Sequence, residues 1–227
     1  MKKHIKSNII LVLSILGICV GLALIFNGQI KNALVHQNQV AGMKNITKQT
    51  IKKNQTKKTS YDFSKVDSLG WKEVAESRTS KNRYDYGIGA ISIPSVGMIL
   101  PIEKGLNNSN MAIGGCTMRP DQIMGKGNYP LAGHYMTSSG GLFSPLENVK
   151  IGDNVYLTDL KTIYTYQINM KKIVEPTAVW LVNNTSTPMV TLITCADGGQ
   201  KRWALRGTLV AQEPATTQKL KNLNFQN

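Results

Sequence analysis

The chain has 227 residues and a formal net charge of +14, from 27 basic and 13 acidic residues. This length allows one domain of about 150 residues plus appendages. The first 60 positions hold lysines but no acidic residue, so most of the excess charge lies outside the expected folded part, as in a solvated tail. The remainder is mildly basic and has no arginine-rich stripe with interleaved aromatic residues, which argues against a nucleic-acid partner.

The N-terminus carries an apolar run from Ile9 to Phe26 that follows three lysines. Its length is at the lower end for a helix that crosses a ~30 Å hydrocarbon core, and the lysines favour a cytoplasmic N-terminus. A cleaved signal peptide is the alternative, but residues 26–30 offer no small-residue cleavage site. We therefore expect a cytoplasmic N-terminus over residues 1–8, an uncleaved transmembrane signal-anchor over 9–26, and the remainder outside the cell.

Residues 27–82 are rich in Lys, Asn, Gln, Thr and Ser and poor in large apolar side chains. This composition predicts a polar basic linker that buries little surface. A short helix is expected near Trp71–Ala75. At the other end of the chain, residues 213–227 are polar and are expected to form a frayed tail.

Between these segments, residues 83–212 alternate short β-branched runs with Gly, Pro and Asn breaks. Several short strands with few helical periods are typical of an all-β barrel or sandwich. Asp121–Met124 is expected to form a helical turn. The expected strands are Gly89–Ile93, Gly97–Ile102, Asn154–Thr158, Thr162–Asn169, Lys172–Glu175, Met189–Cys195 and Trp203–Ala211.

The cysteines limit the redox chemistry. Cys19 lies in the apolar run, where it is most simply a small apolar residue. Cys116 and Cys195 lie in the exported part, where one disulfide could form, and spacing alone does not decide whether it does. No cluster of His and Cys has the spacing of a zinc site.

The segment Thr191–Cys195 ends an apolar, β-branched run with a cysteine, and Ala196–Gln200 breaks the run directly afterwards. Arg202 follows and opens the next strand-like run. If the two strands are antiparallel neighbours, the residues between them form a hairpin loop, and Cys195 and Arg202 lie at the same rim of the sheet, where catalytic residues tend to sit. His134 lies in a Gly-flanked turn and is also expected at a rim.

Cysteine, histidine and arginine together are sufficient for thiol-based acyl transfer. The thiolate is the attacking species, yet the reference pKa leaves only about 3% of an isolated thiol ionised at pH 7. A nearby Arg202 would favour the Cys195 thiolate and could donate hydrogen bonds to an oxyanion. His134 could protonate the leaving amine as a general acid.

Each of these residues also has a structural explanation. A single cysteine in an apolar strand is usually structural, His134 could cap a loop, and Arg202 could be a surface charge on an edge strand. Arg206 is the nearest rival to Arg202, because residues four apart on a strand share a face. The structural explanations are independent, whereas one catalytic interpretation covers all three residues.

These motifs resemble those of the class A sortases, the membrane-anchored transpeptidases of Gram-positive bacteria. The resemblance runs from about residue 84 to residue 212, in family order, and includes the layout of anchor and linker. The matching segments are Gly127–His134, Leu142–Leu146, Val174–Thr177, Thr191–Cys195 and Arg202–Gly207.

The resemblance implies an eight-stranded sortase-type β-barrel with short helices. It also implies cleavage of a Leu-Pro-x-Thr-Gly (LPXTG) sorting signal between Thr and Gly, with a thioester forming on Cys195. An amine of the peptidoglycan precursor lipid II would resolve the thioester and fix the surface protein to the cell wall. His134 would be the acid/base, Arg202 would steady substrate and oxyanion, and Thr194 falls beside the oxyanion.

Further positions match the family's substrate groove, with ordinary core packing as the alternative for most of them. The groove itself is lined by Ala132 and Ile193. Its helix-and-loop wall begins with Cys116 and Thr117. The loop that covers the substrate holds Val179 and Leu181. Cys116 departs from the small non-thiol residue usual in the family and could pair oxidatively with Cys195. We expect no structural disulfide.

Some sortases bind calcium through several acidic residues before the histidine. Residues 121–127 supply only one acid here, whereas a hard cation requires many oxygens, so we expect calcium-independent activity without a metal or other cofactor. The single N-terminal span favours the housekeeping class over pilin-polymerising sortases. A thiol hydrolase of the same signal and a non-enzymatic wall- or lipid-binding module are the alternatives.

Overall fold

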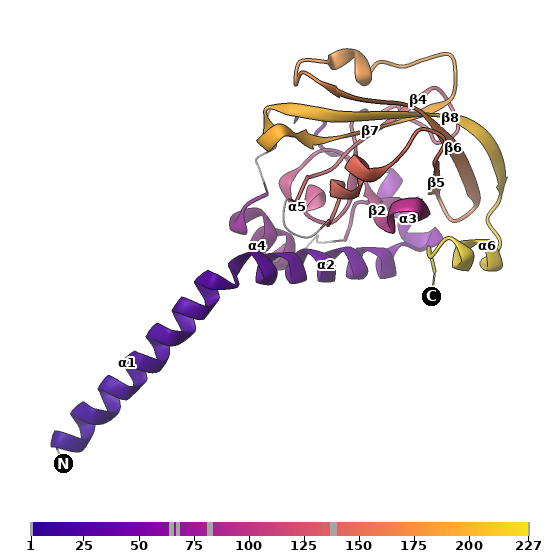
Figure 1. Cartoon of the computed structure of the whole chain (residues 1–227). Coiled ribbons are helices and arrows are strands. Elements are labelled where there is room, and N and C mark those ends of the chain that lie inside the picture. Colours follow the sequence, from indigo (N-terminus) through magenta and orange to yellow (C-terminus); the bar gives the residue numbers. More distant parts are fainter. Residues whose placement is uncertain (1, 64–65, 67–68, 81–83, 137–139, 227) are drawn as a thin grey trace.

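The computed structural model describes residues 2–63, 66, 69–80, 84–136 and 140–226. A barrel of strands stands on a long helix, and a second helix projects away from it at the N-terminus (Figure 1).

Within the described residues, eight strands close into a barrel in the order β1-β2-β3-β4-β7-β8-β6-β5. This confirms the eight-stranded barrel with short helices that the resemblance implied. Neighbouring strands are antiparallel except for β2–β3 and β4–β7, which are parallel. The strands are β1 (Gly87–Ile93), β2 (Met98–Glu103), β3 (Gly115–Thr117), β4 (Asn128–Ala132), β5 (Asn154–Thr158), β6 (Thr162–Val174), β7 (Met189–Ala196) and β8 (Lys201–Pro214).

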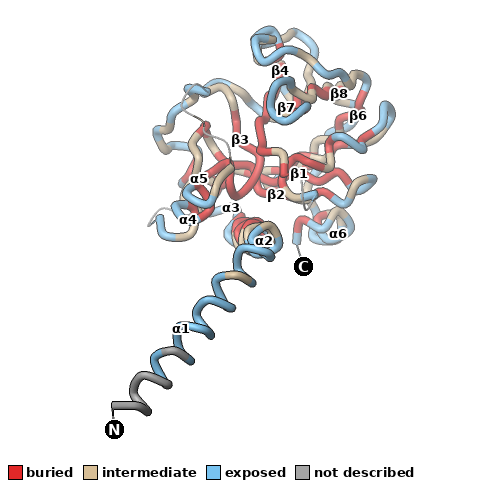
Figure 2. Tube along the Cα trace, turned by 60° about the vertical axis from the view of Figure 1, so that its left-hand side comes forward, coloured by how far each residue is buried: buried red, intermediate tan, exposed pale blue. Residues whose placement is uncertain are grey.

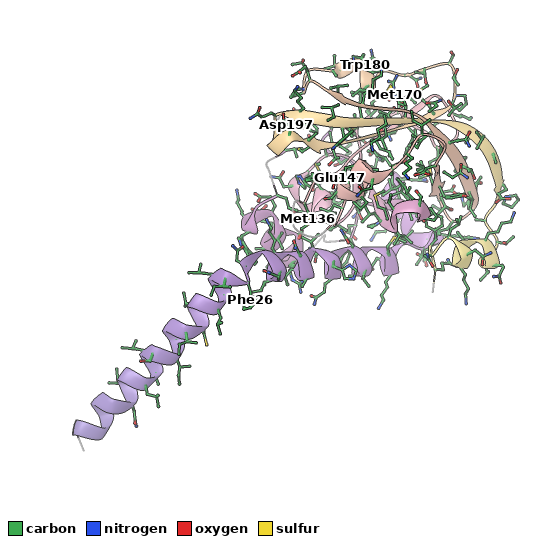
Figure 3. All side chains as sticks on the ribbon, viewed as in Figure 1. Phe26, Met136, Glu147, Met170, Trp180 and Asp197 are labelled. Carbon is green, nitrogen blue, oxygen red and sulfur yellow. The ribbon has the colours of Figure 1, made fainter. Side chains whose placement is uncertain are left out.

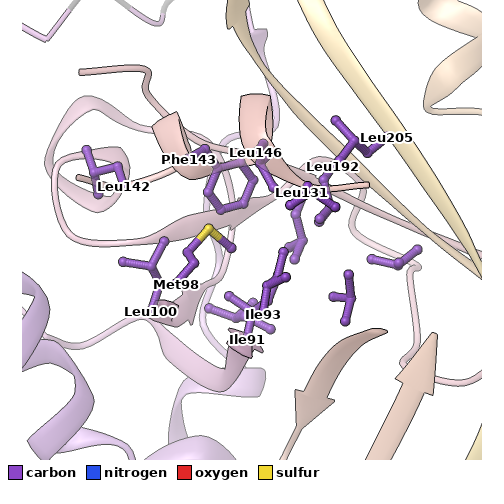
Figure 4. Packing of buried hydrophobic residues seen from close by; sticks show 14 of the residues in the cluster. Ile91, Ile93, Met98, Leu100, Leu131, Leu142, Phe143, Leu146, Leu192 and Leu205 are labelled. Carbon is purple, nitrogen blue, oxygen red and sulfur yellow. The ribbon is translucent and has the colours of Figure 1, made fainter. Parts of the chain in front are cut away.

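Aliphatic and aromatic side chains from the strands and nearby turns form the main hydrophobic core. Burial of such side chains contributes about 1.5–3 kcal/mol each relative to exposure, which makes this core the main source of stability. Figure 4 shows part of the cluster, including Ile91, Ile93, Leu100, Leu131, Leu192 and Leu205. Short helical turns connect the strands: η2 (Pro94–Val96), α5 (Asn108–Met111), η3 (Ser144–Asn148), η4 (Val179–Leu181) and η5 (Asp197–Gly199).

Three details of the expected strand pattern were wrong. The two strands expected between Thr162 and Glu175 are one strand, β6, because register shifts against β8 absorb the irregular stretch. Strands β3 and β4 were not expected, since β3 is very short and β4 contains Pro130, and proline argues against a central strand. Asp121–Met124 is not helical but leads into a turn closed by a bridge between Ile123 and Lys126.

The described residues between 27 and 82 do not form the unburied linker that their composition predicted. Val35, Ile51 and Val74 from this segment are each less than 5% exposed. A few apolar residues that fall on one helical face are enough to dock a helix, and an average composition hides that pattern. The expected short helix near Trp71 is confirmed. The helices of this segment are α2 (Asn27–Asn45), α3 (Lys48–Gln55) and α4 (Trp71–Thr79).

Polar side chains strengthen the docking of these helices. The buried Asn38 amide of α2 donates to Ser77 Oγ of α4 at 2.8 Å. Asn54 of α3, also buried, donates from Nδ2 to the carbonyl of Gly87 in β1 at 2.9 Å. Buried polar groups are satisfied in this way, so amide-rich helices can pack against a barrel.

The C-terminal segment is also ordered, contrary to the expected frayed tail. Strand β8 continues to Pro214, and helix α6 follows over Thr217–Asn222. Leu220 and Phe225 are 3% and 5% exposed, and they pack in a second apolar cluster that includes Ile51 of α3. Two large apolar residues are therefore enough to fasten the end of the chain to the barrel.

Helix α1 spans Lys2–Ile25 and extends away from the remaining elements (Figures 1 and 2). Its described apolar side chains are largely exposed, for example Leu16 at 57%. Across the described residues, no single helix has both the length and the hydropathy of a membrane span. Leu11–Ile25 and Asn27–Asn45 meet that criterion only together, as a pair bent by 69°.

Candidate active site

Cys195 is the second-to-last residue of β7 and is partly exposed, whereas the five residues before it are buried. The tight η5 turn follows, with Asp197 at a φ of 51° and Gly198 at 63°. This left-handed backbone is unusual for a residue with a side chain. The thiol therefore lies at the rim of the barrel, where the chain reverses direction. This rim is near the labelled Asp197 in Figure 3.

Arg202 is the second residue of β8, and its Cα pairs directly with that of Cys195. The hairpin expected from the sequence is confirmed. Arg202 Nη1 donates to the carbonyl of Gly199 at 2.7 Å and to that of Lys201 at 2.9 Å. These bonds hold the guanidinium against the hairpin, at the same rim as the thiol.

His134 follows β4 and is 6% exposed. Its carbonyl accepts a hydrogen bond from the Phe143 amide at 3.0 Å, which fixes the backbone. A side chain at the preceding residue, Gly133, would meet the Phe143 ring at 2.5 Å, so glycine is required for this close approach. The imidazole Nε2 is buried without a hydrogen-bond partner.

Burial determines the protonation state of His134. Loss of solvation lowers its pKa to about 4, against a smaller opposing effect from the negative charge of Glu73. At neutral pH the imidazole is therefore neutral.

A cavity of about 210 Å³ brings the three predicted side chains together. His134, Cys195 and Arg202 all line it, so the convergence expected from the sequence is present in the fold. The other lining residues come from β4 and the residue after it, β7, η5, α5 and the stretch before α4: Phe63, Val66, Met111, Ala132, Gly133, Ile193, Thr194 and Gly199.

Ala132, Ile193 and Thr194 also line this cavity. Ala132 and Ile193 are Cα partners in the parallel pairing of β4 with β7. Thr194 Oγ1 donates to the carbonyl of Gly133 at 2.8 Å. This bond ties the strand that carries the thiol to the turn that carries His134.

The two residues expected in the covering loop differ in their surroundings. Leu181 is 2% exposed and packs with Ile193 and Ala204, whereas Val179 on the same η4 turn is 73% exposed. Neither lines the cavity around the thiol. Figure 3 shows the labelled Trp180 on this turn, at the outer side of the barrel.

Cys116 and Thr117 do not line the cavity around the thiol. Cys116 is fully buried in a cluster with Met111 and Ala132, behind the cavity wall, and both it and Cys195 are free cysteines. Burial and the nearby Glu103 raise the Cys116 pKa well above its usual value, so this thiol is not activated. Thr117 Oγ1 accepts from the Gly105 amide at 2.8 Å and lines a separate cavity of about 260 Å³.

Several residues near the site carried no recognisable signal in the sequence. Phe63 and Val66 line the cavity from a stretch that was expected to be linker. Glu73 lies on α4, and its carboxylate accepts from the Gly70 amide at 2.7 Å while its charge acts on His134. Phe63 and Val66 precede α4 and Glu73 lies on it, so tertiary packing of this stretch, rather than any local pattern, brings these side chains to the site.

Comparisons with known proteins identify the family to which the chain belongs. The sortase domain family matches residues 91–210. Sortase A of Listeria monocytogenes is 38% identical over 218 residues, which covers 94% of this chain and 96% of that protein. Sortase A of Streptococcus agalactiae is 43% identical over 192 residues, which covers 82% and 77%, respectively. The solved structure of the Listeria sortase A gives a TM-score of 0.61 at 41% identity and covers 63% of this chain and 100% of that one.

The chain therefore belongs to the sortase family. Its relatives place it with the sortase A type: it is a cysteine transpeptidase that anchors LPXTG proteins to the cell wall.

Proposed function

We propose that Cys195 is the nucleophile of this transpeptidase, that His134 transfers the proton and that Arg202 stabilises charge at the reaction centre. The one observation that carries the proposal is the cavity that all three side chains line. An acyl carbonyl bound in it would meet a thiol, an imidazole and a guanidinium at once, which is what thiol-based acyl transfer requires.

The neutral state of His134 determines the direction of the proton transfers. A neutral imidazole accepts the Cys195 proton as the sulfur attacks the threonine carbonyl of the sorting signal. The imidazolium then gives that proton to the departing glycine amine as the amide bond breaks, which leaves a thioester. In the second half, His134 takes a proton from the attacking amine and returns it to the Cys195 thiolate.

Arg202 is positioned to act on the oxyanion. Its Nη1 is held by hairpin carbonyls, so the planar group needs little reorganisation when substrate binds. A guanidinium has five N–H donors, enough to bond both the hairpin and an oxyanion. Its Cα pairing with Cys195 supports this role.

We assign the sorting signal to the surface formed by β4, β7 and the η4 turn. Ala132, Ile193 and Thr194 would contact the residue at the scissile bond, because they line the cavity beside the thiol. Leu181 packs on Ile193 and would support the wall of the groove farther out, with Val179 exposed beside it. Cys116 and Thr117 belong to the packing behind the wall, and we assign them no substrate contact.

We propose that activity needs no calcium. Asp121, the only acid in residues 121–127, accepts two hydrogen bonds from Arg119, at 3.0 and 2.6 Å. Throughout the described part of the chain, no group of three or more His, Cys, Asp and Glu side chains could hold a metal ion. A calcium titration that gave a large, saturable rate increase would contradict this proposal.

We further propose that α1 anchors the enzyme in the cell membrane in a single pass, with residues 1–8 in the cytoplasm, residues 9–26 in the bilayer and the barrel outside. The exposed apolar side chains of α1 support this proposal, as do the lysines that precede them. Cysteines introduced on either side of α1, in a background with Cys19, Cys116 and Cys195 replaced by alanine, would test it through their accessibility to an impermeant thiol reagent in intact cells.

The acceptor amine belongs to a peptidoglycan precursor, lipid II, in this proposal. The test mixes the full chain with an LPXTG peptide and a glycine-based amine and analyses the products. A product that carries the amine supports transfer, whereas free peptide acid alone would identify a hydrolase. No cleavage of the signal would overturn the proposed site.

A further inference from the structure

The connection between β6 and β7 spans residues 175–188 and contains only the short η4 turn. Connections of this length without their own secondary structure are usually mobile unless other elements hold them. In this protein, side chains from other elements hold the connection. Each of the four consecutive carbonyls from Trp180 to Asn183 accepts a hydrogen bond from a side chain outside the loop.

Asn128 of β4 is the central contact. Its Nδ2 donates to the carbonyl of Leu181 and to that of Asn183, both at 2.8 Å. The backbone N–H of Asn128 donates to Asn184 Oδ1 at 3.1 Å, and the side-chain Oδ1 of Asn128 accepts from Thr191 Oγ1 at 2.7 Å. Asn128 is fully buried, and buried polar groups with all their hydrogen bonds made specify one arrangement of the backbone around them.

Arg206 of β8 holds the same turn from the other side. Its Nη2 donates to the carbonyl of Trp180 at 3.2 Å and to that of Leu181 at 3.3 Å. The guanidinium carbon lies 4.6 Å from the centroid of the Trp180 ring, which adds a cation–π attraction. Arg206 Nε also donates to Thr191 Oγ1 at 3.3 Å, which joins it to Asn128 through one shared hydroxyl.

Arg119, from the connection between β3 and β4, provides the third contact. Its Nη1 donates to the carbonyl of Val182 at 3.2 Å. The remaining nitrogens of the group donate to both carboxylate oxygens of Asp121, which fixes the plane of the guanidinium. Gln122 Oε1 accepts from the backbone amide of Arg119, so the donor loop is itself ordered.

We infer that Asn128, Arg119 and Arg206 form a side-chain clamp that sets the β6–β7 loop in its substrate-binding position before substrate arrives. The inference rests on the proposed function, because it takes this loop as one wall of the groove for the sorting signal. Two of the clamp residues, Asn128 and Arg206, bond the carbonyl of Leu181. The Leu181 side chain packs on Ile193, in the strand that leads to Cys195. A loop already ordered costs less conformational entropy on binding, so the clamp acts on affinity for the peptide.

The three residues are positioning residues, because none of them lines the cavity around Cys195. This separates two kinetic quantities. Loss of the clamp should raise KM for the sorting peptide and leave the reactivity of the Cys195 thiol unchanged. A residue that acted on the thiol or the oxyanion would instead lower kcat.

The test compares Arg119→Ala, Arg206→Gln and Arg119→Lys with the wild-type full chain, and uses Lys172→Ala, an exposed cation on β6, as the matched control. We expect KM for the LPXTG peptide to rise about tenfold in Arg119→Ala and in Arg206→Gln, with kcat and the rate of Cys195 alkylation within about twofold of wild type. Arg119→Lys keeps the positive charge and N–H donors on a single nitrogen, so it should recover part of the affinity. Hydrogen exchange of residues 178–184 should quicken in the first two variants.

Unchanged KM and unchanged exchange in both variants would overturn the inference. A fall in kcat with constant KM would also overturn it, since that pattern belongs to a group acting in the chemical step. If the wild-type chain formed no acyl adduct with the peptide, the proposed function itself would fail, and this outcome is distinct from that of the clamp variants.

Discussion

Cys195 and Arg202 face each other as Cα partners across β7 and β8, at the rim where the two strands are joined by a tight hairpin. The short loop leaves the two side chains little freedom to separate. Thiol and guanidinium are therefore neighbours because of the strand register, whether or not a substrate is bound.

Replacement of Arg202 by lysine tests the use of this pairing. Lysine keeps the charge but lacks the planar fork that can bond the hairpin and an oxyanion together. We expect kcat/KM to fall by roughly 10²-fold, as for loss of an oxyanion donor elsewhere. Steady-state kinetics with a sorting peptide would measure it, with Lys201→Ala, at an exposed position, as the control. Near-wild-type activity of Arg202→Lys would exclude a role for the fork.

The buried His134 makes stability depend on pH. Its pKa is about 4 in the folded protein and 6.5 in the unfolded chain, so the unfolded state binds the proton more readily between these values. The free energy of unfolding is therefore unaffected by His134 above pH 6.5, and it decreases as the pH falls toward 4 because the unfolded chain takes up the proton first. At pH 5 the loss should be about 2 kcal/mol.

Urea unfolding of wild type and His134→Leu at pH 7 and pH 5 would measure this loss. The leucine variant lacks the titrating group, so the free energy of unfolding of the wild type should fall by more over this interval. Parallel changes in the two proteins would show that His134 is not buried in the neutral form.

Glu103 of β2 gives the opposite dependence. It is 1% exposed and its Oε2 has no partner, and burial raises its pKa from 4.5 to about 8. The contribution of protonated Glu103 to the free energy of unfolding is fully present below pH 4.5. It is lost as the pH rises toward 8, because the unfolded chain then releases the proton first. Relative to Glu103→Gln, the wild type should lose roughly 2–4 kcal/mol between pH 5 and pH 8.

The comparison requires denaturant unfolding of both proteins at the two pH values. Glu175→Gln, at an exposed position, should show no such effect. A constant difference between wild type and Glu103→Gln would mean that Glu103 keeps an ordinary pKa.

The N-terminal helices should stabilise the barrel rather than merely connect it to α1. Val74 of α4 is 1% exposed and packs in the main core. Val74→Ala removes buried apolar volume and should lower the free energy of unfolding by about 1–3 kcal/mol. Val40→Ala on α2, which is 41% exposed, is the control. Equal stabilities of the two variants would show that α4 is not part of the cooperative fold.

Much of the fold could be predicted because its signals are local. The apolar run that ends at Cys195, the break after it and the run from Trp203 identify a hairpin without any long-range information. β4 was missed because Pro130 argues locally against a strand that is specified by its partner β7. Helices α2 and α3 were missed because their stability comes from tertiary packing and not from composition.

In the site, too, some features could be predicted from the local sequence and others depend on tertiary packing. His134, Cys195 and Arg202 were identified from residue type, spacing and family resemblance, and the fold brings them to one cavity. The influence of Glu73 depends on how α4 docks, which no local pattern encodes. Thr117 likewise lines a different cavity from the one around the thiol, which its position in the sequence does not reveal.

The most direct test of the central claim is mass spectrometry of the full chain after reaction with an LPXTG peptide. We expect a mass increase equal to the peptide through its threonine, on a fragment that contains Cys195, and no increase in Cys195→Ala. An adduct on Cys116, or an adduct that persists in Cys195→Ala, would contradict the assignment of the nucleophile.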